Sequence, residues 1–160
     1  MRPVTLIYCL HEDLVLLGVK KRGFGAGKLN GYGGKVHSDE DILDATIREL
    51  FEEAKIHALK EDLEKIAEID FFFSDVPIDK DWNQTVHVYS LRNWNGEPKE
   101  TEEMKPEWHK RNVMPMERMW IDDPYWLPKV LEGEKIQASF TFGKQGESIM
   151  DYNIKIINSF

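Results

Sequence analysis

Three glutamates lie within five residues of the sequence, shortly after a pair of glycines. Glu49 precedes Glu52 by three positions and Glu53 by four, so on a helix the three would be surface neighbours. Like charges at this spacing destabilise an isolated helix by about 0.2–0.5 kcal/mol per pair. Carboxylates are ligands of hard cations such as Mg²⁺, and Gly33 and Gly34 let the backbone approach a ligand closely. The pattern fits either a solvated acidic face or a cation site.

The segment His37–Lys55 has the pattern of a helix that would carry these glutamates. Apolar residues recur at helical spacing and predict a stripe facing the core, formed by Leu43, Ile47, Leu50 and Ala54. Ser38 is the expected N-cap, and the acidic residues after it suit the positive first turn. Arg48 lies to one side of these glutamates, where it can hold a glutamate in place by a bidentate contact.

The rest of the chain predicts a sheet that surrounds this helix. Strands are expected at Val4–Leu10, Leu14–Val19, Glu64–Phe73, Gln84–Leu91, Ala138–Phe142 and Ile149–Ile157, with a short extended piece around Trp108 and at Val113–Met116. A second helix is expected from Asp123 to Leu131, with Pro124 at its first turn. The pattern predicts one mixed α/β domain over residues 1–160, with a sheet dominated by hairpins and two helices packed against it.

Composition and charge limit the partners of this domain. Hydrophobic residues make up 41% of the chain, which is typical of a folded globule, and the net charge of −8 disfavours binding to nucleic-acid polymers. An acidic chain can still bind a small polyphosphate through a metal ion. The single cysteine, Cys9, suits a reducing compartment, and no apolar run is long enough to span a membrane. We therefore expect a soluble cytoplasmic protein.

The spacing of the glycine and glutamate positions resembles that of a known family. Gly34, Glu40, the run Arg48–Leu50 and the pair Glu52–Glu53 match the box that defines the Nudix hydrolases. Lys55 departs from the pattern, because the family usually has a glycine there. That glycine ends the helix, so the difference concerns a helix cap and not a metal ligand.

The resemblance implies a Nudix fold, in which a mixed sheet lies in an α/β/α sandwich and the box forms a loop-helix-loop. It also implies that water attacks phosphorus in a pyrophosphate linkage, with Mg²⁺ as the cofactor and Mn²⁺ as an alternative. The implied metal ligands are Gly33 through its carbonyl, Glu49, Glu52, Glu53 and Glu103, and the implied catalytic residues are Arg48, Glu49, Glu52 and Glu53. Glu52 and Glu53 are both candidates for the general base, and the sequence does not choose between them.

Further segments resemble the MutT-type branch of the family, which hydrolyses oxidised purine nucleoside triphosphates to the monophosphate and pyrophosphate. These segments are Lys20–Lys35, Val86–Tyr89, Glu102–Trp108, Met119–Pro128 and Ile149–Ile154. The resemblance implies a monomer that binds a modified purine nucleoside triphosphate. The implied substrate-binding residues are Thr5, Lys20, Phe24, Asn30, Tyr32, Gly34, Lys35, Phe71, Phe73, Trp120, Asp122, Asp123 and Trp126. One of the two neighbouring aspartates is expected to keep its proton.

Several of these residues also fit simpler roles. Asp122 and Asp123 precede Pro124, so they fit an N-cap, and the tryptophans fit a core. The run Lys20–Arg22 fits a solvated patch as well as a phosphate site.

The chain also departs from the MutT-type branch near the expected base pocket. Leu29 replaces a tryptophan, a pocket methionine is missing near Gln84, and the loop Asp75–Asn83 is longer. These differences leave the base open among 8-oxo-dGTP, 2-oxo-dATP and methylated purines. A Nudix enzyme for another nucleoside diphosphate derivative and an inactive nucleotide sensor are the alternatives, although the intact glutamates favour an enzyme.

Overall fold

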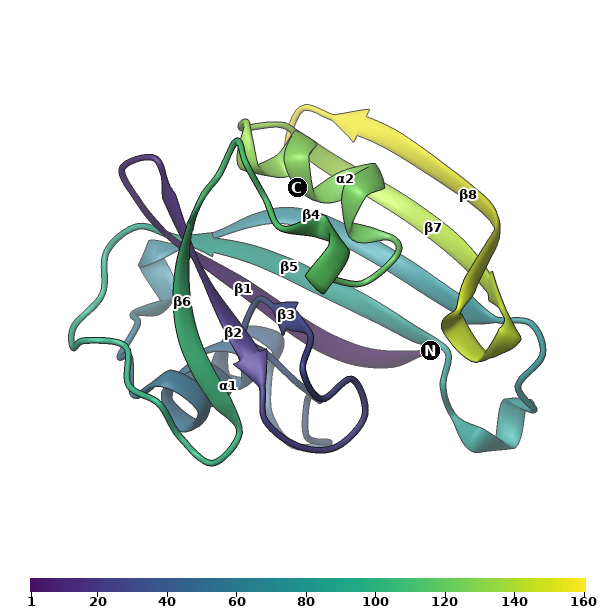
Figure 1. Ribbon diagram of the computed structural model, residues 1–160, viewed down its shortest axis with the longest axis horizontal. Coiled ribbons are helices and arrows are strands. Elements are labelled where there is room, and N and C mark those ends of the chain that lie inside the picture. Colours follow the sequence, from purple (N-terminus) through teal and green to yellow (C-terminus); the bar gives the residue numbers. More distant parts are fainter.

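Eight strands form one mixed sheet in the computed structural model, which describes residues 1–160. The strands are β1 (Arg2–His11), β2 (Leu14–Lys20), β3 (Leu29–Asn30), β4 (Leu63–Phe73), β5 (Gln84–Leu91), β6 (Met104–Lys110), β7 (Lys135–Gly143) and β8 (Ser148–Ile157). The helices are α1 (Ile42–Ala54) and α2 (Asp123–Leu131). Figure 1 shows α2 in front of the sheet and α1 behind it, which is the expected α/β/α sandwich.

The strand order is β3-β2-β1-β5-β4-β7-β8, and β6, which lies outside this order, also pairs with β2. The expected hairpins β1–β2 and β7–β8 are present and β4 and β5 also pair antiparallel, but parallel pairs β1–β5 and β4–β7 join these units. The sheet is therefore less dominated by hairpins than the sequence predicted, because the segments between the paired strands cross over and return.

The glycine-rich loop reaches the centre of the sheet because β2 pairs with β1 over only a few residues. The two strands pair only between Cys9–Leu16 and His11–Leu14. The rest of that edge of β1 is filled by the loop, whose Tyr32 carbonyl accepts from Ile7 N–H (2.6 Å) and whose Gly34 carbonyl accepts from Thr5 N–H (2.8 Å). Gly33 and Gly34 are thus fixed against β1, between the sheet and α1.

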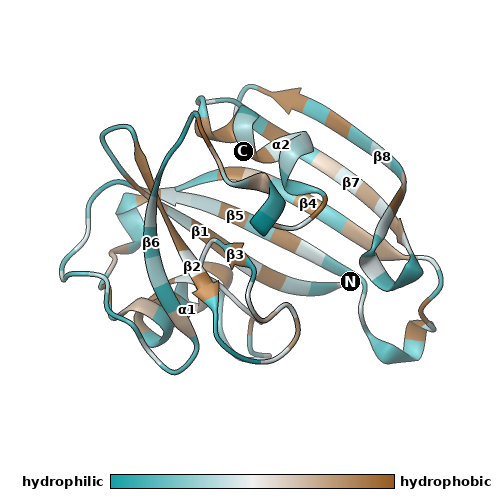
Figure 2. Ribbon diagram, viewed as in Figure 1, coloured by the Kyte–Doolittle hydropathy of each residue, from teal (hydrophilic) through white to brown (hydrophobic).

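Two apolar cores lie on the two faces of the sheet. Alternation along β1 turns Ile7 and Cys9 toward α1, and Tyr8 and Leu10 toward α2. The same alternation of apolar and polar residues is visible along the strands in Figure 2. Leu50 and Ala54 of the predicted helix stripe are buried in the α1 core, and Leu43 and Ile47 pack against it, as expected.

The predicted ends of α1 were partly wrong. The helix begins at Ile42 instead of His37, and its N-cap is Asp41 instead of Ser38, because the Asp41 carboxylate accepts from Asp44 N–H (2.8 Å). At the other end Lys55 is the C-cap, with the left-handed φ of 61° that normally favours glycine. The difference from the family pattern therefore does fall on a cap.

Apart from the short β3, which was not predicted, the strands and α2 lie within a few residues of the prediction, except near Val113. The segment Val113–Met116 is not a strand, since β6 ends at Lys110 and a short 3₁₀ turn follows at Met116–Arg118. Pro115 has no N–H to donate to a neighbouring strand, which disfavours an extended ladder here.

Candidate active site

Arg48 organises the glutamates of α1. Its Nε and Nη2 donate to the two carboxylate oxygens of Glu40 (3.0 and 2.6 Å), which is the bidentate contact that the sequence predicted. Its Nη1 reaches Glu49 (3.1 Å) and Glu52 (3.3 Å). Hydrogen bonds from Arg48 and from His37 N–H lower the pKa of Glu40 to about 2. Arg48 is therefore placed to orient carboxylates.

The glycine pair brings the backbone against two of these glutamates. Gly33 N–H donates to Glu53 Oε1 (2.9 Å). A Cβ at Gly33 would lie 2.0 Å from the Thr5 carbonyl oxygen, and a Cβ at Gly34 would lie 2.6 Å from the Glu49 carboxyl carbon. A side chain at Gly33 would meet the backbone of β1, and one at Gly34 would displace the Glu49 carboxylate, which explains why two glycines precede the helix.

Glu53 is a half-buried carboxyl with an unusual electrostatic environment. Burial and, to a lesser extent, the charges of Glu49 and Glu103 raise its pKa to about 8, against the opposing effects of the Gly33 N–H and Lys20. Burial likewise raises the pKa of Glu49, against the opposing effect of Arg48. Both carboxyls would be stabilised as anions by a nearby cation.

The donors around Glu53 fit a hard divalent cation, although the side chains are not gathered into a finished metal cluster. Glu49 and Glu53 offer carboxylate oxygens, and the Gly33 carbonyl beside them accepts no hydrogen bond within the chain. Oxygen donors of this kind are those that Mg²⁺ uses, often together with substrate phosphates. Glu103 differs from these residues because its carboxylate is paired with Arg22.

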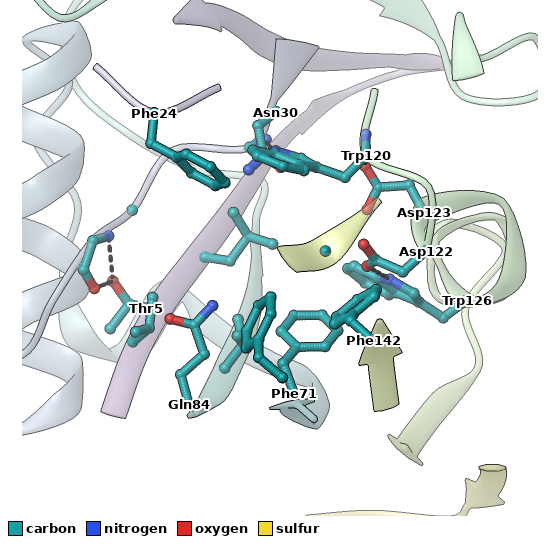
Figure 3. Close-up of a pocket in the computed structure, with 18 residues that line it drawn as sticks. Thr5, Phe24, Asn30, Phe71, Gln84, Trp120, Asp122, Asp123, Trp126 and Phe142 are labelled. Atoms are coloured by element: carbon teal, nitrogen blue, oxygen red, sulfur yellow. Dashed lines mark hydrogen bonds between the residues drawn. The ribbon is translucent and has the colours of Figure 1, made fainter. Parts of the chain in front are cut away.

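A cavity of about 250 Å³ opens next to the glycine pair (Figure 3). Six of its 18 lining residues are aromatic, and they come from the glycine-rich loop, β4, β7, α2 and the segment before α2. Ten of the predicted substrate-binding residues line it, namely Thr5, Phe24, Asn30, Gly34, Phe71, Phe73, Trp120, Asp122, Asp123 and Trp126. The structure thus gathers residues that are far apart in the sequence into one pocket.

The carboxyl pair at the deep end of the cavity is almost fully buried. Asp122 is 6% exposed and accepts from Trp126 Nε1 (2.8 Å), and Asp123 is 2% exposed and accepts from Trp120 N–H (3.2 Å). Burial raises the pKa of both carboxyls, and the charge of Asp122 raises that of Asp123 further. The pair can therefore keep a proton at neutral pH, so that it offers both a donor and an acceptor.

The cavity also has an amide and a flat aromatic surface beside the carboxyl pair (Figure 3). Asn30 Oδ1 accepts from Gly31 N–H (2.9 Å), which leaves the Asn30 amide nitrogen free to donate. Trp120 stacks on Phe24 with ring centroids 5.4 Å apart, and a Cβ at Gly25 would lie 2.6 Å from the indole. A planar base fits between these rings and the phenylalanines of β4 and β7.

Three predicted substrate-binding residues lie outside the cavity. Lys20 lies near Glu53, where its charge lowers the pKa of that carboxyl, and Lys35 is exposed at the loop that leads to α1. Tyr32 does not line the cavity either. Its side chain is fully buried in the α1 core, on the other face of the sheet. Tyr32 pairs with Ile7 in an antiparallel bridge, and residues paired in this way turn their side chains to the same face.

The sequence reasoning also missed several cavity residues. Gln84, Val86 and Phe142 line the pocket, and Trp82 packs against Phe24 and Phe73 at ring distances of 6.0 and 5.4 Å. The alternation of β5 and β7 could have placed Val86 and Phe142 on the face shared with Phe71. Nothing local could have indicated Trp82, since it lies in an irregular loop.

The chain belongs to the Nudix family, because the model of the NUDIX domain matches residues 1–130. Nudix hydrolases use divalent metal ions, in accordance with the oxygen donors around Glu53. The mouse protein named oxidized purine nucleoside triphosphate hydrolase is 40% identical over 159 residues, which are 99% of this chain and 97% of the mouse protein. The zebrafish protein of the same name is 40% identical over 92% of this chain and 89% of its own length.

Solved structures agree with the fold. A MutT protein from Bacillus halodurans superposes with a TM-score of 0.81 at 24% identity, over 97% of this chain and 98% of that protein. A MutT NUDIX hydrolase from Burkholderia pseudomallei gives a TM-score of 0.67 at 22% identity, over 81% of this chain and 97% of that protein. At these identities the likeness supports the Nudix fold and not a substrate.

Proposed function

We propose that this protein is a Mg²⁺-dependent hydrolase of oxidised purine nucleoside triphosphates, which releases the monophosphate and pyrophosphate. Its role would be to remove damaged nucleotides from the precursor pool of a cytoplasm. The proposal rests on the glycine pair, which forms a wall of both the aromatic cavity and the carboxylate site. Gly33 and Gly34 line the aromatic cavity and at the same time contact Glu53 and Glu49. A nucleotide whose base fills the cavity would direct its phosphates to these glutamates.

The base would be recognised at the deep end of the cavity. The ionised carboxyl of the pair Asp122–Asp123 would accept N–H groups of the purine, and the protonated one would donate to a ring acceptor or carbonyl. Asn30 would donate through its free amide nitrogen, and Trp120 would stack on the ring. Two relatives at 40% identity that carry the name oxidized purine nucleoside triphosphate hydrolase support this substrate class.

The phosphates would be bound on the α1 side of the glycine pair. Gly33 by its carbonyl, Glu49, Glu52 and Glu53 would hold Mg²⁺, and Glu103 would join them on release from Arg22. When bound, the ion would neutralise phosphate charge and make bound water more acidic. Arg48 would keep Glu49 and Glu52 oriented, and Lys20 would offset negative charge near Glu53. Glu52 or Glu53 would accept the proton of the attacking water.

A substrate panel tests the proposal. Pyrophosphate release would be measured with Mg²⁺ for 8-oxo-dGTP, 2-oxo-dATP, O6-methyl-dGTP, dGTP and dATP. We expect the modified purines to be the preferred substrates, and Glu53→Gln to lose nearly all turnover while its melting temperature stays at or above that of the wild type. Higher activity on ADP-ribose than on any triphosphate would refute the substrate class, and an active Glu53→Gln variant would refute the metal site. Gel filtration would test the expectation of a monomer.

A further inference from the structure

Gln84 presents a polar group on an apolar wall of the base cavity. It is the first residue of β5, and the alternation of the strand turns Gln84 and Val86 into the cavity. Thr85 points to the other face, where its hydroxyl pairs with Asp70. Figure 3 shows Gln84 across the cavity from Asn30 and Trp120, next to Phe71. The amide therefore places a polar group in the cavity beside the ring of Phe71, its partner across β4 and β5.

Arg2 fixes which end of this amide faces the cavity. Arg2 and Gln84 are partners in the parallel register of β1 and β5, and Arg2 Nη2 donates to Gln84 Oε1 (3.2 Å). A guanidinium has donors only, so the carbonyl oxygen of the amide must be the atom that faces Arg2. The amide nitrogen is then the free end, and in Figure 3 it points into the cavity.

The free N–H groups of Gln84 have no acceptor within the chain. Around them the cavity wall is made of Phe71, Phe73 and Phe142. An N–H donor in such surroundings penalises a ligand that leaves it unpaired, and a ligand that offers an oxygen gains a hydrogen bond in a dry site. The wall thus discriminates between bases that differ by one acceptor.

We infer that Gln84 is a specificity-determining residue, whose amide N–H donates to an added carbonyl oxygen on the base of the bound nucleotide. Arg2 is a positioning residue that orients the amide and does not touch the ligand. The inference rests on the proposed function and narrows it. The preferred substrates are oxo-purine nucleoside triphosphates, ahead of methylated purines, which bring a methyl group and no new acceptor.

The test compares the selectivity of matched variants on the same panel of nucleotides. Gln84→Met removes the donor at nearly constant side-chain length, and Gln84→Glu replaces the donor by an acceptor at constant shape. Gln137→Met is the control, since Gln137 is exposed on β7 outside the cavity. We expect both Gln84 variants to lower the ratio of kcat/KM for 8-oxo-dGTP over O6-methyl-dGTP by about tenfold, and the control to leave it unchanged.

Arg2 is tested by rescue. Arg2→Ala should raise KM for 8-oxo-dGTP several-fold with little change in kcat, because a free amide can rotate away. Arg2→Lys should recover much of the loss, because an ammonium can still donate to Gln84 Oε1. A structural role alone would lower the melting temperature of both variants and would not separate KM from kcat.

The outcomes separate the two proposals. If the wild type hydrolyses oxidised triphosphates but Gln84→Met and Gln84→Glu keep its selectivity ratio within twofold, the role of Gln84 is refuted and the proposed function stands. If the wild type hydrolyses none of the oxo-purine nucleotides, the proposed function fails and the role of Gln84 fails with it. Should Gln84→Met melt much lower than the wild type, the isosteric Gln84→Glu variant decides the matter by the same ratio.

Discussion

Gly34→Ala is expected to remove catalysis and to leave the fold intact. A methyl group at this position would meet the carboxylate of Glu49 at 2.6 Å, and no backbone atom is among its nearest neighbours. Gly34 does not have a positive φ, so alanine is sterically allowed by the backbone. The Glu49 carboxylate must then move by roughly 1 Å, and a shift of that size in a catalytic group can cost about 100-fold in rate.

The neighbouring glycine gives the matched comparison. A methyl group at Gly33 would lie 2.0 Å from the carbonyl oxygen of Thr5, which belongs to the central strand β1 and cannot move freely. Gly33→Ala should therefore destabilise the protein by about 1–3 kcal/mol or more, as overpacking of a rigid site does. Gly34→Ala should change the free energy of unfolding by less than about 1 kcal/mol, because a flexible side chain absorbs the clash.

Both variants would be assayed by pyrophosphate release and by urea unfolding followed through tryptophan fluorescence. The expected result is a stable, inactive Gly34→Ala protein and a destabilised Gly33→Ala protein. The reasoning would be refuted by a Gly34→Ala enzyme that keeps more than a third of wild-type kcat/KM. It would equally be refuted if the two variants lost the same amount of stability, since the clashes would then not differ in kind.

Two further predictions concern stability. Lys55 caps α1 with a left-handed φ of 61°, a conformation that glycine adopts without strain. Lys55→Gly should therefore be more stable than Lys55→Ala by about 1 kcal/mol in urea unfolding. Equal stabilities would contradict backbone strain at this position. Burial raises the pKa of Asp123 in the folded state, so its contribution to stability is full below about pH 4 and is lost as the pH rises through the raised pKa. Wild-type stability should thus fall with pH more steeply than that of Asp123→Asn, by up to about 1.4 kcal/mol per unit, and parallel curves from pH 4 to 8 would rule this out.

The sequence was sufficient where the relevant pattern is local. The apolar stripe of α1, the alternation of the strands and the proline at the start of α2 each depend on neighbours a few residues away, and the predicted elements were found. The start of α1 was wrong because the run Ser38–Asp41 contains several residues that can cap a helix. In the structure the Asp41 carboxylate caps the helix by accepting from Asp44 N–H, and Arg48 holds the neighbouring Glu40 by its two carboxylate oxygens.

Contacts between distant strands were beyond the reach of local patterns. Arg2 and Gln84 are 82 positions apart, and only the parallel register of β1 and β5 brings the guanidinium to the amide. Tyr32 illustrates the same limit, because the resemblance put it in the pocket while the pairing of its backbone with Ile7 turned the ring into the other core. A residue's membership of a motif therefore does not decide the face of the sheet on which its side chain lies.

The two acidic groups of the protein look alike in sequence and differ only in their surroundings. Asp122–Asp123 and Glu52–Glu53 are both adjacent carboxylates, and burial raises the pKa of three of the four. A buried carboxyl must be neutralised by a proton or by a cation. The aspartates are almost fully buried, and although the charge of Lys28 acts on Asp123, neither forms an ion pair, so a proton is the available partner. Glu53 lies near the carboxylate of Glu49 and accepts a hydrogen bond from Gly33 N–H, so a divalent cation fits there. One physical requirement thus supports both the proposed base-reading role of the aspartates in the cavity and the candidate metal site beside it.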